Sequence, residues 1–153
     1  MENVCSHYAA NENLYTATVS PVCEKYGLTY MEFTVLMFLA NNPQFDTASD
    51  IVKYRHLTKS HVSMSIRSLE AKGLLKGEYH KPNRRTIHLT VLNAADAIVA
   101  AGREAQQEFG KILFSGFSDS EYKQFTSFMN RIDQNIADHI EQMQNKENKN
   151  GIK

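Results

Sequence analysis

The sequence predicts a mainly α-helical fold that carries one small β-hairpin. Apolar residues recur every three or four positions over most of the 153 residues, and capping motifs stand where several of these stretches begin. The helical period gives way near residues 74–91 to a segment with the composition of strands. The length suits one domain with a core of its own, and 42% hydrophobic with 22% charged residues is typical of globular proteins.

Two helices are expected first. Residues 4–26 form a weakly amphipathic helix, which we expect to be interrupted near Pro21 and closed by Gly27. The motif TYME at 29–32 is a capping box, in which a threonine and a glutamate side chain accept each other's backbone amide groups, and it opens the next helix. The buried face of that helix is expected to consist of Phe33, Leu36, Met37, Leu39 and Ala40.

The next segment has the pattern of a helix-turn-helix. The motif TASD at 47–50 caps a short helix that ends near Tyr54, and Thr58 begins a second helix that ends at Gly73. Two short helices joined by a three- or four-residue turn are typical of this motif. The buried side of the second helix is expected to contain Val62, Ile66 and Leu69.

A hairpin follows the second helix directly. Residues 74–79 lead into the basic turn HKPNRR at 80–85, and residues 86–91 are enriched in the β-branched residues that strands favour. A hairpin in this position is a wing. The elements together therefore predict a winged helix-turn-helix.

The C-terminal third predicts two long helices. Residues 93–96 cap a helix that runs to about Phe114 and contains many small residues, which allow close approach of another helix. The motif SDSE at 118–121 is a second capping box and opens the last helix. The last helix carries an apolar stripe at three- or four-residue steps, which consists of Tyr122, Phe125, Met129, Ile132, Ile136, Ile140 and Met143.

Such a stripe more often belongs to an intramolecular core than to a partner surface. Here, however, long helices flank one small central domain, and that domain alone cannot bury the stripes of both. We therefore expect a homodimer. The expected parts are an N-terminal dimerisation helix at 1–28, a winged helix-turn-helix DNA-binding lobe at 29–92, C-terminal dimerisation helices at 93–146 and a flexible tail at 147–153.

Positive charge is concentrated in the predicted helix-turn-helix and wing. Residues 53–88 contain nine lysines and arginines but two acids, a net charge of +7, so that the rest of the neutral chain carries −7. Four histidines in the same stretch add positive charge as the pH falls. A local basic field is the electrostatic signature of a nucleic-acid-binding face, and a solvated basic face without a partner is the alternative.

The sequence has no enzyme motif. It contains no Gly-rich phosphate loop, no Cys-x-x-Cys, no His-Glu-x-x-His and no nucleophile elbow, and its six histidines lack metal-ligand spacing. We therefore expect no catalytic residue, no metal and no cofactor. There is also no apolar run long enough to span a membrane and no signal peptide, so we expect a cytoplasmic protein in which Cys5 and Cys23 are reduced.

Nearly the whole chain resembles the winged-helix transcription regulators of the MarR (multiple antibiotic resistance regulator) family. The segments that carry the resemblance are LTYMEFTVLMFLA at 28–40, TASDIVKY at 47–54, LTKSHVSMSIRSLEAKGLL at 57–75 and NRRTIHLTVLNAA at 83–95. The family usually has Asp-x-Arg at the wing tip, where this sequence has Asn83-Arg84-Arg85. In the family, the carboxylate of this aspartate helps to hold the wing arginine. Its replacement by Asn83 therefore affects the direction in which Arg85 points.

The resemblance implies a homodimeric repressor that binds a pseudo-palindromic DNA site, with a recognition helix in the major groove and a basic wing in the minor groove. Serine and histidine side chains on the exposed side of the helix would contact bases or phosphates, and the lysine and arginines would contact phosphates or the minor groove. The candidate DNA-binding residues are Lys59, Ser60, His61, Ser63, Met64, Arg67, Arg84 and Arg85. The alternative is a winged helix that binds an acidic protein partner.

Two kinds of control are compatible with the sequence. Cys5 lies 25 residues before Tyr30, which is similar to a spacing in the peroxide-sensing branch of the family, although a second tyrosine of that branch would fall at Val19. The alternative is an unreactive thiol. A small aromatic or apolar inducer would, by the same resemblance, bind between the dimerisation helices and the DNA-binding lobe. Its pocket would be lined by Tyr8, Tyr15, Tyr26, Phe33, Met37 and Phe109, which could equally be ordinary core residues.

Overall fold

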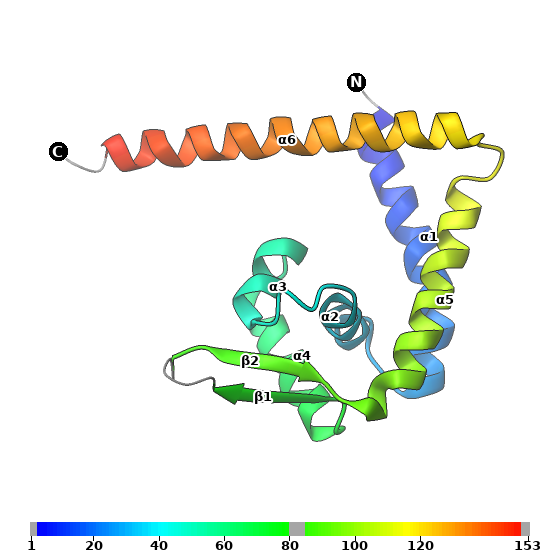
Figure 1. Cartoon of the computed structure of the whole chain (residues 1–153), viewed down its shortest axis with the longest axis vertical. Helices are drawn as coiled ribbons and strands as arrows, with labels where there is room; N and C mark the ends of the chain where they lie inside the picture. The colour runs from blue at the N-terminus through cyan, green and yellow to red at the C-terminus, as the bar shows by residue number, and fades with distance from the viewer. Residues whose placement is uncertain (1–2, 80–84, 151–153) are drawn as a thin grey trace. The chain divides into compact units, whose positions relative to one another are not determined.

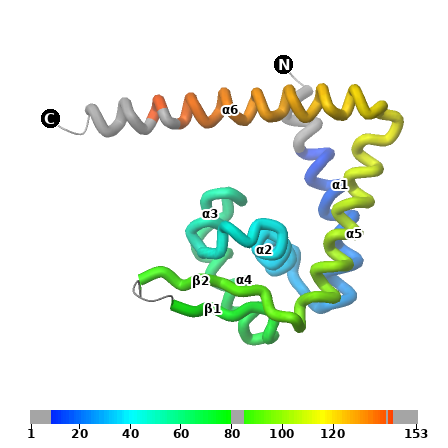
Figure 2. Tube along the Cα trace, in the orientation of Figure 1, coloured from blue at the N-terminus to red at the C-terminus, as the bar shows by residue number. Residues whose placement is uncertain are grey.

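The computed structural model describes the backbone of residues 3–79 and 85–150 and the side chains of residues 9–79, 85–140, 142 and 143. The chain forms two compact units, Met1–Lys111 and Ile112–Lys153. It is mainly helical with a two-stranded antiparallel sheet, as predicted (Figures 1 and 2). The elements are α1 (Asn3–Tyr26), α2 (Tyr30–Asn41), α3 (Ala48–Arg55), α4 (Lys59–Ala71), β1 (Leu75–Tyr79), β2 (Ile87–Val91), the 3₁₀ turn η1 (Asn93–Ala95), α5 (Asp96–Leu113) and α6 (Asp119–Asn150).

The first helix, α1, continues through Pro21, so the predicted interruption is wrong. Proline removes one backbone donor from a helix and usually kinks it. Here Pro21 is exposed, while Val19 and Cys23 on either side of it are buried in a core cluster, and this packing holds the helical turn. Gly27 follows the helix in the left-handed conformation with a φ of 62°, as expected for a glycine that closes a helix.

The second helix, α2, begins at the predicted capping box. The Thr29 hydroxyl accepts the Glu32 amide, and the Glu32 carboxylate accepts the Thr29 amide. Residues 33–39 are all buried, which corrects the prediction of a single buried face. The reason is that α2 lies between two core clusters: Phe33 and Met37 pack against α1 and α5, and most of the other side chains join the larger core of the winged helix.

The predicted helix-turn-helix consists of α3 and α4. The capping box at 47–50 is present at the start of α3, and the Thr58 hydroxyl accepts the His61 amide at 3.3 Å at the start of α4. His56, between the helices, has a left-handed φ of 52°, which reverses the chain within three residues. The residues of α4 that face the core are Val62, Ser65, Ile66 and Leu69.

The wing is present in the predicted place. The strands β1 and β2 pair antiparallel from Leu75↔Val91 to Tyr79↔Ile87, and the turn at 80–84 lies outside the described residues. Leu75 is buried at the base of the hairpin, whereas Tyr79 and Ile87 near its tip are 56% and 45% exposed. The described part of the hairpin therefore contacts the core through its base.

The start of α5 differs from the prediction of a side-chain cap at residues 93–96. The chain forms the 3₁₀ turn η1, whose N-cap is Leu92, and no side chain caps it. Ala95 is fully buried in the core and holds the start of α5 in place of a cap.

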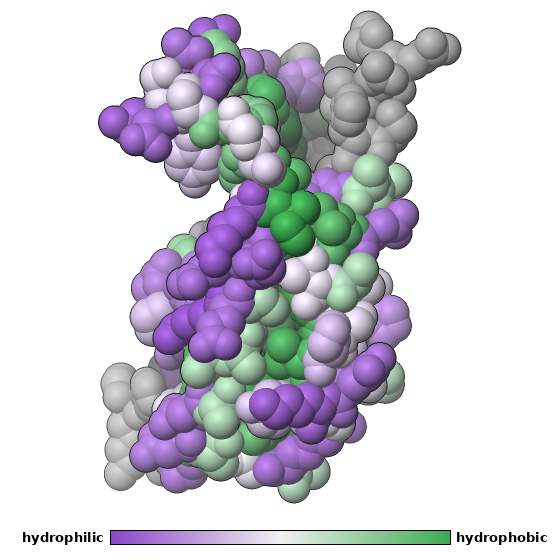
Figure 3. Space-filling model, turned by 90° about the vertical axis from the view of Figure 1, so that its right-hand side faces the viewer, coloured by the Kyte–Doolittle hydropathy of each residue, from purple (hydrophilic) through white to green (hydrophobic). Residues whose placement is uncertain are grey.

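Further along, α5 packs closely on α2 and α1. A Cβ atom built on Gly102 would lie 2.5 Å from Met37 Sδ and 3.0 Å from Phe33 Cε2, so the predicted close approach at small residues is confirmed here. Gln106 donates a hydrogen bond of 2.9 Å to the Tyr15 hydroxyl of α1, which lies beside α5 in Figure 1. Figure 3 faces the side on which α5 lies and shows hydrophilic residues gathered in bands beside apolar ones, as expected of amphipathic helices.

The second unit consists mainly of α6. Its predicted capping box is present, because the Ser118 hydroxyl accepts the Glu121 amide and the Glu121 carboxylate accepts the Ser118 amide. Within this unit, Phe114 makes edge-to-face contacts with three aromatic rings, those of Phe117, Tyr122 and Phe125. Helix α6 continues to Asn150, through the first residues of the predicted tail. Among the described residues, no helix has the length and apolar character needed to cross a membrane.

Candidate nucleic-acid interface

The exposed side of α4 brings together six of the predicted DNA-binding residues. All six are exposed, including the apolar residue Met64, which is 64% exposed. They are Lys59, Ser60, His61, Ser63, Met64 and Arg67. Because the other side of α4 is fixed by its buried residues, this side presents hydroxyl, imidazole, thioether and cationic groups together on a rigid element.

The wing arginines are described only in part. Arg85 is exposed just before β2, while Arg84 lies outside the described residues. The base of the hairpin contacts the rest of the lobe through polar groups on both strands. The Gly77 amide donates to Glu70 Oε1 of α4 at 3.0 Å, and His88 Nδ1 lies 2.9 Å from Asp46 Oδ1 in the loop before α3.

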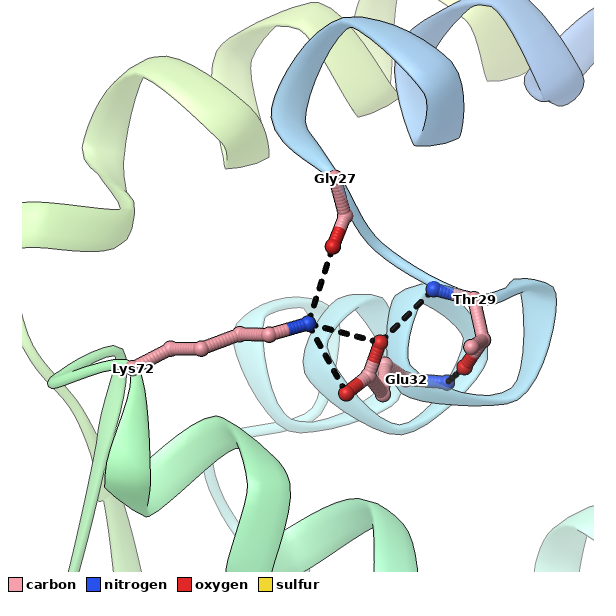
Figure 4. A network of polar contacts seen from close by, with 4 residues as sticks. All are labelled: Gly27, Thr29, Glu32 and Lys72. Atoms are coloured by element: carbon pink, nitrogen blue, oxygen red, sulfur yellow. Dashed lines mark hydrogen bonds and ion pairs between the residues drawn. The ribbon is translucent and has the colours of Figure 1, made fainter.

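The structure reassigns part of the basic field that the sequence predicts. Lys72 Nζ lies 3.0 Å from both carboxylate oxygens of Glu32 and donates to the Gly27 carbonyl oxygen at 2.9 Å (Figure 4). Lys76 forms an ion pair with Glu78 at 2.6 Å. These two lysines serve intramolecular contacts, so the cations of the exposed α4 side are Lys59 and Arg67.

Glu32 is the polar centre of the junction between α1, α2 and α4. Its side chain is 5% exposed. Burial alone would raise the pKa of this carboxyl, but hydrogen bonds from Ser68, Thr29 and Lys72, together with the charge of Lys72, outweigh it and lower the pKa from 4.5 to about 2. The junction therefore ties the C-terminal end of α4 to the end of α1 and the start of α2. Sequence reasoning treated Lys72 as part of the basic surface and missed this role.

Two of the residues predicted to line a ligand pocket border one cavity. A cavity of about 470 Å³ is lined by Asn11, Glu12, Tyr15, Tyr30, Arg55, Gln106 and Phe109. Tyr15 and Phe109 belong to the predicted set, and their rings meet edge to face at 5.2 Å. Arg55 and Tyr30 also line the cavity and were not predicted.

The other predicted pocket residues do not line this cavity. Phe33 and Met37 are buried in the cluster between α1, α2 and α5. Tyr26 packs against the larger core, and its hydroxyl donates to the Ala97 carbonyl oxygen at 3.4 Å. The side chain of Tyr8 lies outside the described residues.

The two cysteines lie in α1. Cys23 is a free, buried thiol, and burial raises its pKa, which disfavours the reactive thiolate. The side chain of Cys5 lies outside the described residues. In the part of the chain that the structure describes, histidine, cysteine, aspartate and glutamate side chains form no group of three that could hold a metal ion.

Fold and exposed helix together define a winged helix-turn-helix protein. Residues 26–85 match the family model described as "MarR family", the family that the motifs of this segment resemble. None of the curated proteins matches the chain.

Solved structures of low sequence identity share the fold. A Listeria monocytogenes protein described as a MarR family transcriptional regulator, in complex with a 26-mer DNA, has a TM-score of 0.78 and 18% identity, with 89% of both chains covered. The S. aureus MepR–DNA complex has a TM-score of 0.70 and 20% identity, over 88% of this chain and 98% of that one. Bordetella bronchiseptica BpsR, whose DNA binding is regulated by 6-hydroxynicotinic acid, has a TM-score of 0.67 and 20% identity, over 86% and 98%.

Proposed function

We propose that the protein is a sequence-specific DNA-binding transcription regulator. In this proposal α4 is the recognition helix and lies in the major groove, while the wing reaches the adjacent minor groove through Arg85. The bound protein represses transcription by occluding a promoter. The observation that carries the proposal is the exposed side of α4, where base-reading and phosphate-binding groups stand together on a helix with a buried opposite side.

The proposed roles follow from the chemistry of each side chain. Ser60, His61 and Ser63 lie near the start of α4, which enters the groove first, and can bond base edges. Lys59 and Arg67 supply charge for phosphates. The DNA complexes of the Listeria monocytogenes protein and of MepR support this use of the shared fold.

The proposed active form is a homodimer. The apolar stripe of α6 is exposed within the described chain, with Phe125 39% and Ile132 48% accessible. Water penalises such surface by about 25 cal/mol per Å² of apolar area, and a second copy of α6 would remove that cost. A twofold dimer would place two recognition helices about 34 Å apart, one turn of DNA, so its site would be pseudo-palindromic.

Salt dependence tests the proposal directly. Binding to a specific duplex should weaken with a log-log slope of about −5 or steeper, because each neutralised phosphate contributes about −0.9. Arg85→Ala should cost roughly 1 to 3 kcal/mol per affected site while the protein stays folded. Fluorescence anisotropy at several salt concentrations gives both quantities. A log-log salt slope of about −1, together with unchanged affinity in Arg85→Ala, would contradict DNA binding by the wing.

Selection from random duplexes separates base reading from anchoring. His61→Ala and Ser63→Ala should change the selected sequence, whereas Lys59→Ala should weaken all duplexes about equally. If the selected sequence stayed that of the parent protein, the proposed side of α4 would not be the side that reads DNA. An acidic protein partner, the rival function, predicts no preference among duplexes.

A second proposal concerns control by a small aromatic molecule. The observation that favours it is the cavity beside α1 and α5, in which Tyr15 and Phe109 supply aromatic faces and Arg55 supplies a cation. Regulation of BpsR by an aromatic acid supports this chemistry. Aromatic carboxylic acids should raise the Tm of the protein and release DNA, and Phe109→Ala should abolish both effects. Equal Tm shifts in the parent and in Phe109→Ala would contradict this pocket.

Peroxide sensing through Cys5 is a separate hypothesis. It requires mild peroxide to release DNA from the parent protein but not from Cys5→Ser, because oxidation of the thiolate would alter the dimer. Cys23→Ser should behave like the parent, since its buried thiol has a raised pKa. Equal release from the parent and from Cys5→Ser would identify Cys5 as an unreactive thiol.

A further inference from the structure

At the middle level of the described hairpin, both strands of the wing form hydrogen bonds to the rest of the lobe. Gly77 of β1 and Leu89 of β2 are register partners. The Gly77 amide donates to Glu70 Oε1 of α4 at 3.0 Å, and the Leu89 amide donates to the Asp46 carbonyl oxygen at 2.7 Å. Next to Leu89, His88 Nδ1 lies 2.9 and 3.0 Å from the two carboxylate oxygens of Asp46.

Gly77 allows the carboxylate of Glu70 to lie against the strand. A Cβ atom at position 77 would be 2.9 Å from Glu70 Oε1 and 2.8 Å from Ile87 Cγ2. A side chain there would displace the carboxylate of Glu70 and the side chain of Ile87. The contact between α4 and β1 therefore depends on a glycine in the middle of a strand, where glycine otherwise weakens pairing.

Packing alone leaves the direction of the wing weakly fixed beyond this level. Glu78, Tyr79 and Ile87 are all exposed. A hollow of about 240 Å³ lies beside the contact, lined in part by Glu70 and Ile87. Because an isolated two-stranded hairpin is marginally stable, its direction depends on its attachment to the lobe.

The charge of Glu70 is unfavourable for DNA binding. It is one of two acids in the +7 segment, on the lobe that would face phosphates. Its side chain lies one turn of α4 beyond Arg67, on the helix that is proposed to read DNA. A carboxylate here repels DNA, so a gain in DNA binding has to come from what the carboxylate holds in place.

We propose that Glu70 is a positioning residue that sets the aim of the wing relative to the recognition helix, with Asp46 as the second anchor. This proposal rests on the DNA-binding function proposed above. Glu70 fixes which base pairs Arg85 reaches once α4 is in the major groove. It acts through the Gly77 amide and does not itself contact DNA.

The test compares Glu70→Ala with Glu70→Gln in the full-length protein. Glutamine keeps an oxygen that can accept the Gly77 amide, so Glu70→Gln should bind a specific duplex at least as tightly as the parent. Glu70→Ala should lose several-fold in affinity, and hydroxyl-radical footprints should weaken at the minor-groove positions covered by the wing but stay at the centre of each half-site. The double variant Glu70→Ala, Arg85→Ala should bind no more weakly than Arg85→Ala alone.

The control is His61→Ala on the α4 side that faces away from the wing contact. Its loss should add to that of Glu70→Ala. Additive losses for Glu70→Ala and Arg85→Ala, or equal weakening by Glu70→Gln and Glu70→Ala, would overturn the positioning role. If Arg85→Ala itself binds DNA like the parent, the proposed contact of the wing with DNA is wrong. The positioning role of Glu70 is then wrong as well, because it requires that contact.

Asp46→Ala provides a second measurement if Glu70→Ala does not fold. This variant keeps the backbone bond to Leu89 and removes the contact with His88. Its effect on affinity should also disappear in the Arg85→Ala background. An effect that persists there would show that Asp46 supports the fold and not the wing.

Discussion

At the scale of single residues, the buried carboxylate of Glu32 shows how one capping residue acquires a second role. In the capping box its carboxylate accepts the Thr29 amide. The folded chain adds Lys72, whose ammonium group bonds both the carboxylate and the Gly27 carbonyl oxygen. A buried charge without such partners is strongly destabilising, so the pair is expected to matter to stability in proportion to its burial.

The lowered pKa of Glu32 predicts a loss of stability in acid. The unfolded carboxyl has a pKa near 4.5 and the folded one a pKa of about 2, so the stabilisation is complete above pH 4.5 and is lost as the pH falls toward 2. The shift corresponds to roughly 3 kcal/mol. Urea unfolding of the parent and of Glu32→Gln from neutral to acidic pH measures it. Parallel curves for the two proteins would show that Glu32 is not the group that titrates.

At the scale of elements, the packing of α5 on α2 depends on the absence of a side chain at Gly102. The same helix contains Gly110, for which a Cβ atom would meet no other atom within 4 Å. The two glycines thus have opposite environments on one helix. Helix propensity favours alanine over glycine at both positions by about 1 kcal/mol.

Substitution of these two glycines separates propensity from packing. Gly110→Ala should stabilise the protein by about 1 kcal/mol. Gly102→Val should destabilise it by roughly 1 to 3 kcal/mol, because its side chain overlaps Met37 and Phe33. Thermal unfolding of both variants provides the measurement. A Gly102→Val protein as stable as the parent would mean that α2 and α5 move apart without cost.

At the scale of the whole molecule, the apolar stripe of α6 is the feature that a single chain leaves exposed to solvent. Eight large apolar side chains of α6 have exposed fractions of 39% to 57%. They are Tyr122, Phe125, Phe128, Met129, Ile132, Ile136, Ile140 and Met143. A stable obligate interface of more than about 2,000 Å² would be ordinary for a dimer built on such helices.

Introducing charged residues into the apolar stripe of α6 tests whether the protein forms the proposed dimer. Phe125→Glu with Ile132→Glu should shift the protein from dimer to monomer, lower its stability and weaken DNA binding, because each half-site is then held alone. Sedimentation at micromolar concentration measures the oligomeric state. Ser127→Glu on the same helix is a control that adds charge at an exposed position outside the stripe. A compact, stable monomer for the parent protein would refute the dimeric model.

The sequence by itself determined the elements and most of their ends. Capping boxes at 29–32, 47–50 and 118–121 and the glycines at 27 and 73 are local features, because they depend on residues within one turn of each other. The exposed side of α4 was predictable for the same reason, since a helix with a buried row must present its other side to solvent.

Only the tertiary structure decided what depends on neighbours distant in sequence. Packing on both sides buried α2 all round and kept α1 helical through Pro21. Lys72 forms an ion pair because Glu32, 40 residues away in the sequence, lies beside it, and Arg55 lines a cavity together with residues of α1 and α5. The attachment of the wing through Glu70 and Asp46 belongs to the same class. Each of these contacts is set by the folded arrangement of elements, which periodicity and capping within one element do not specify.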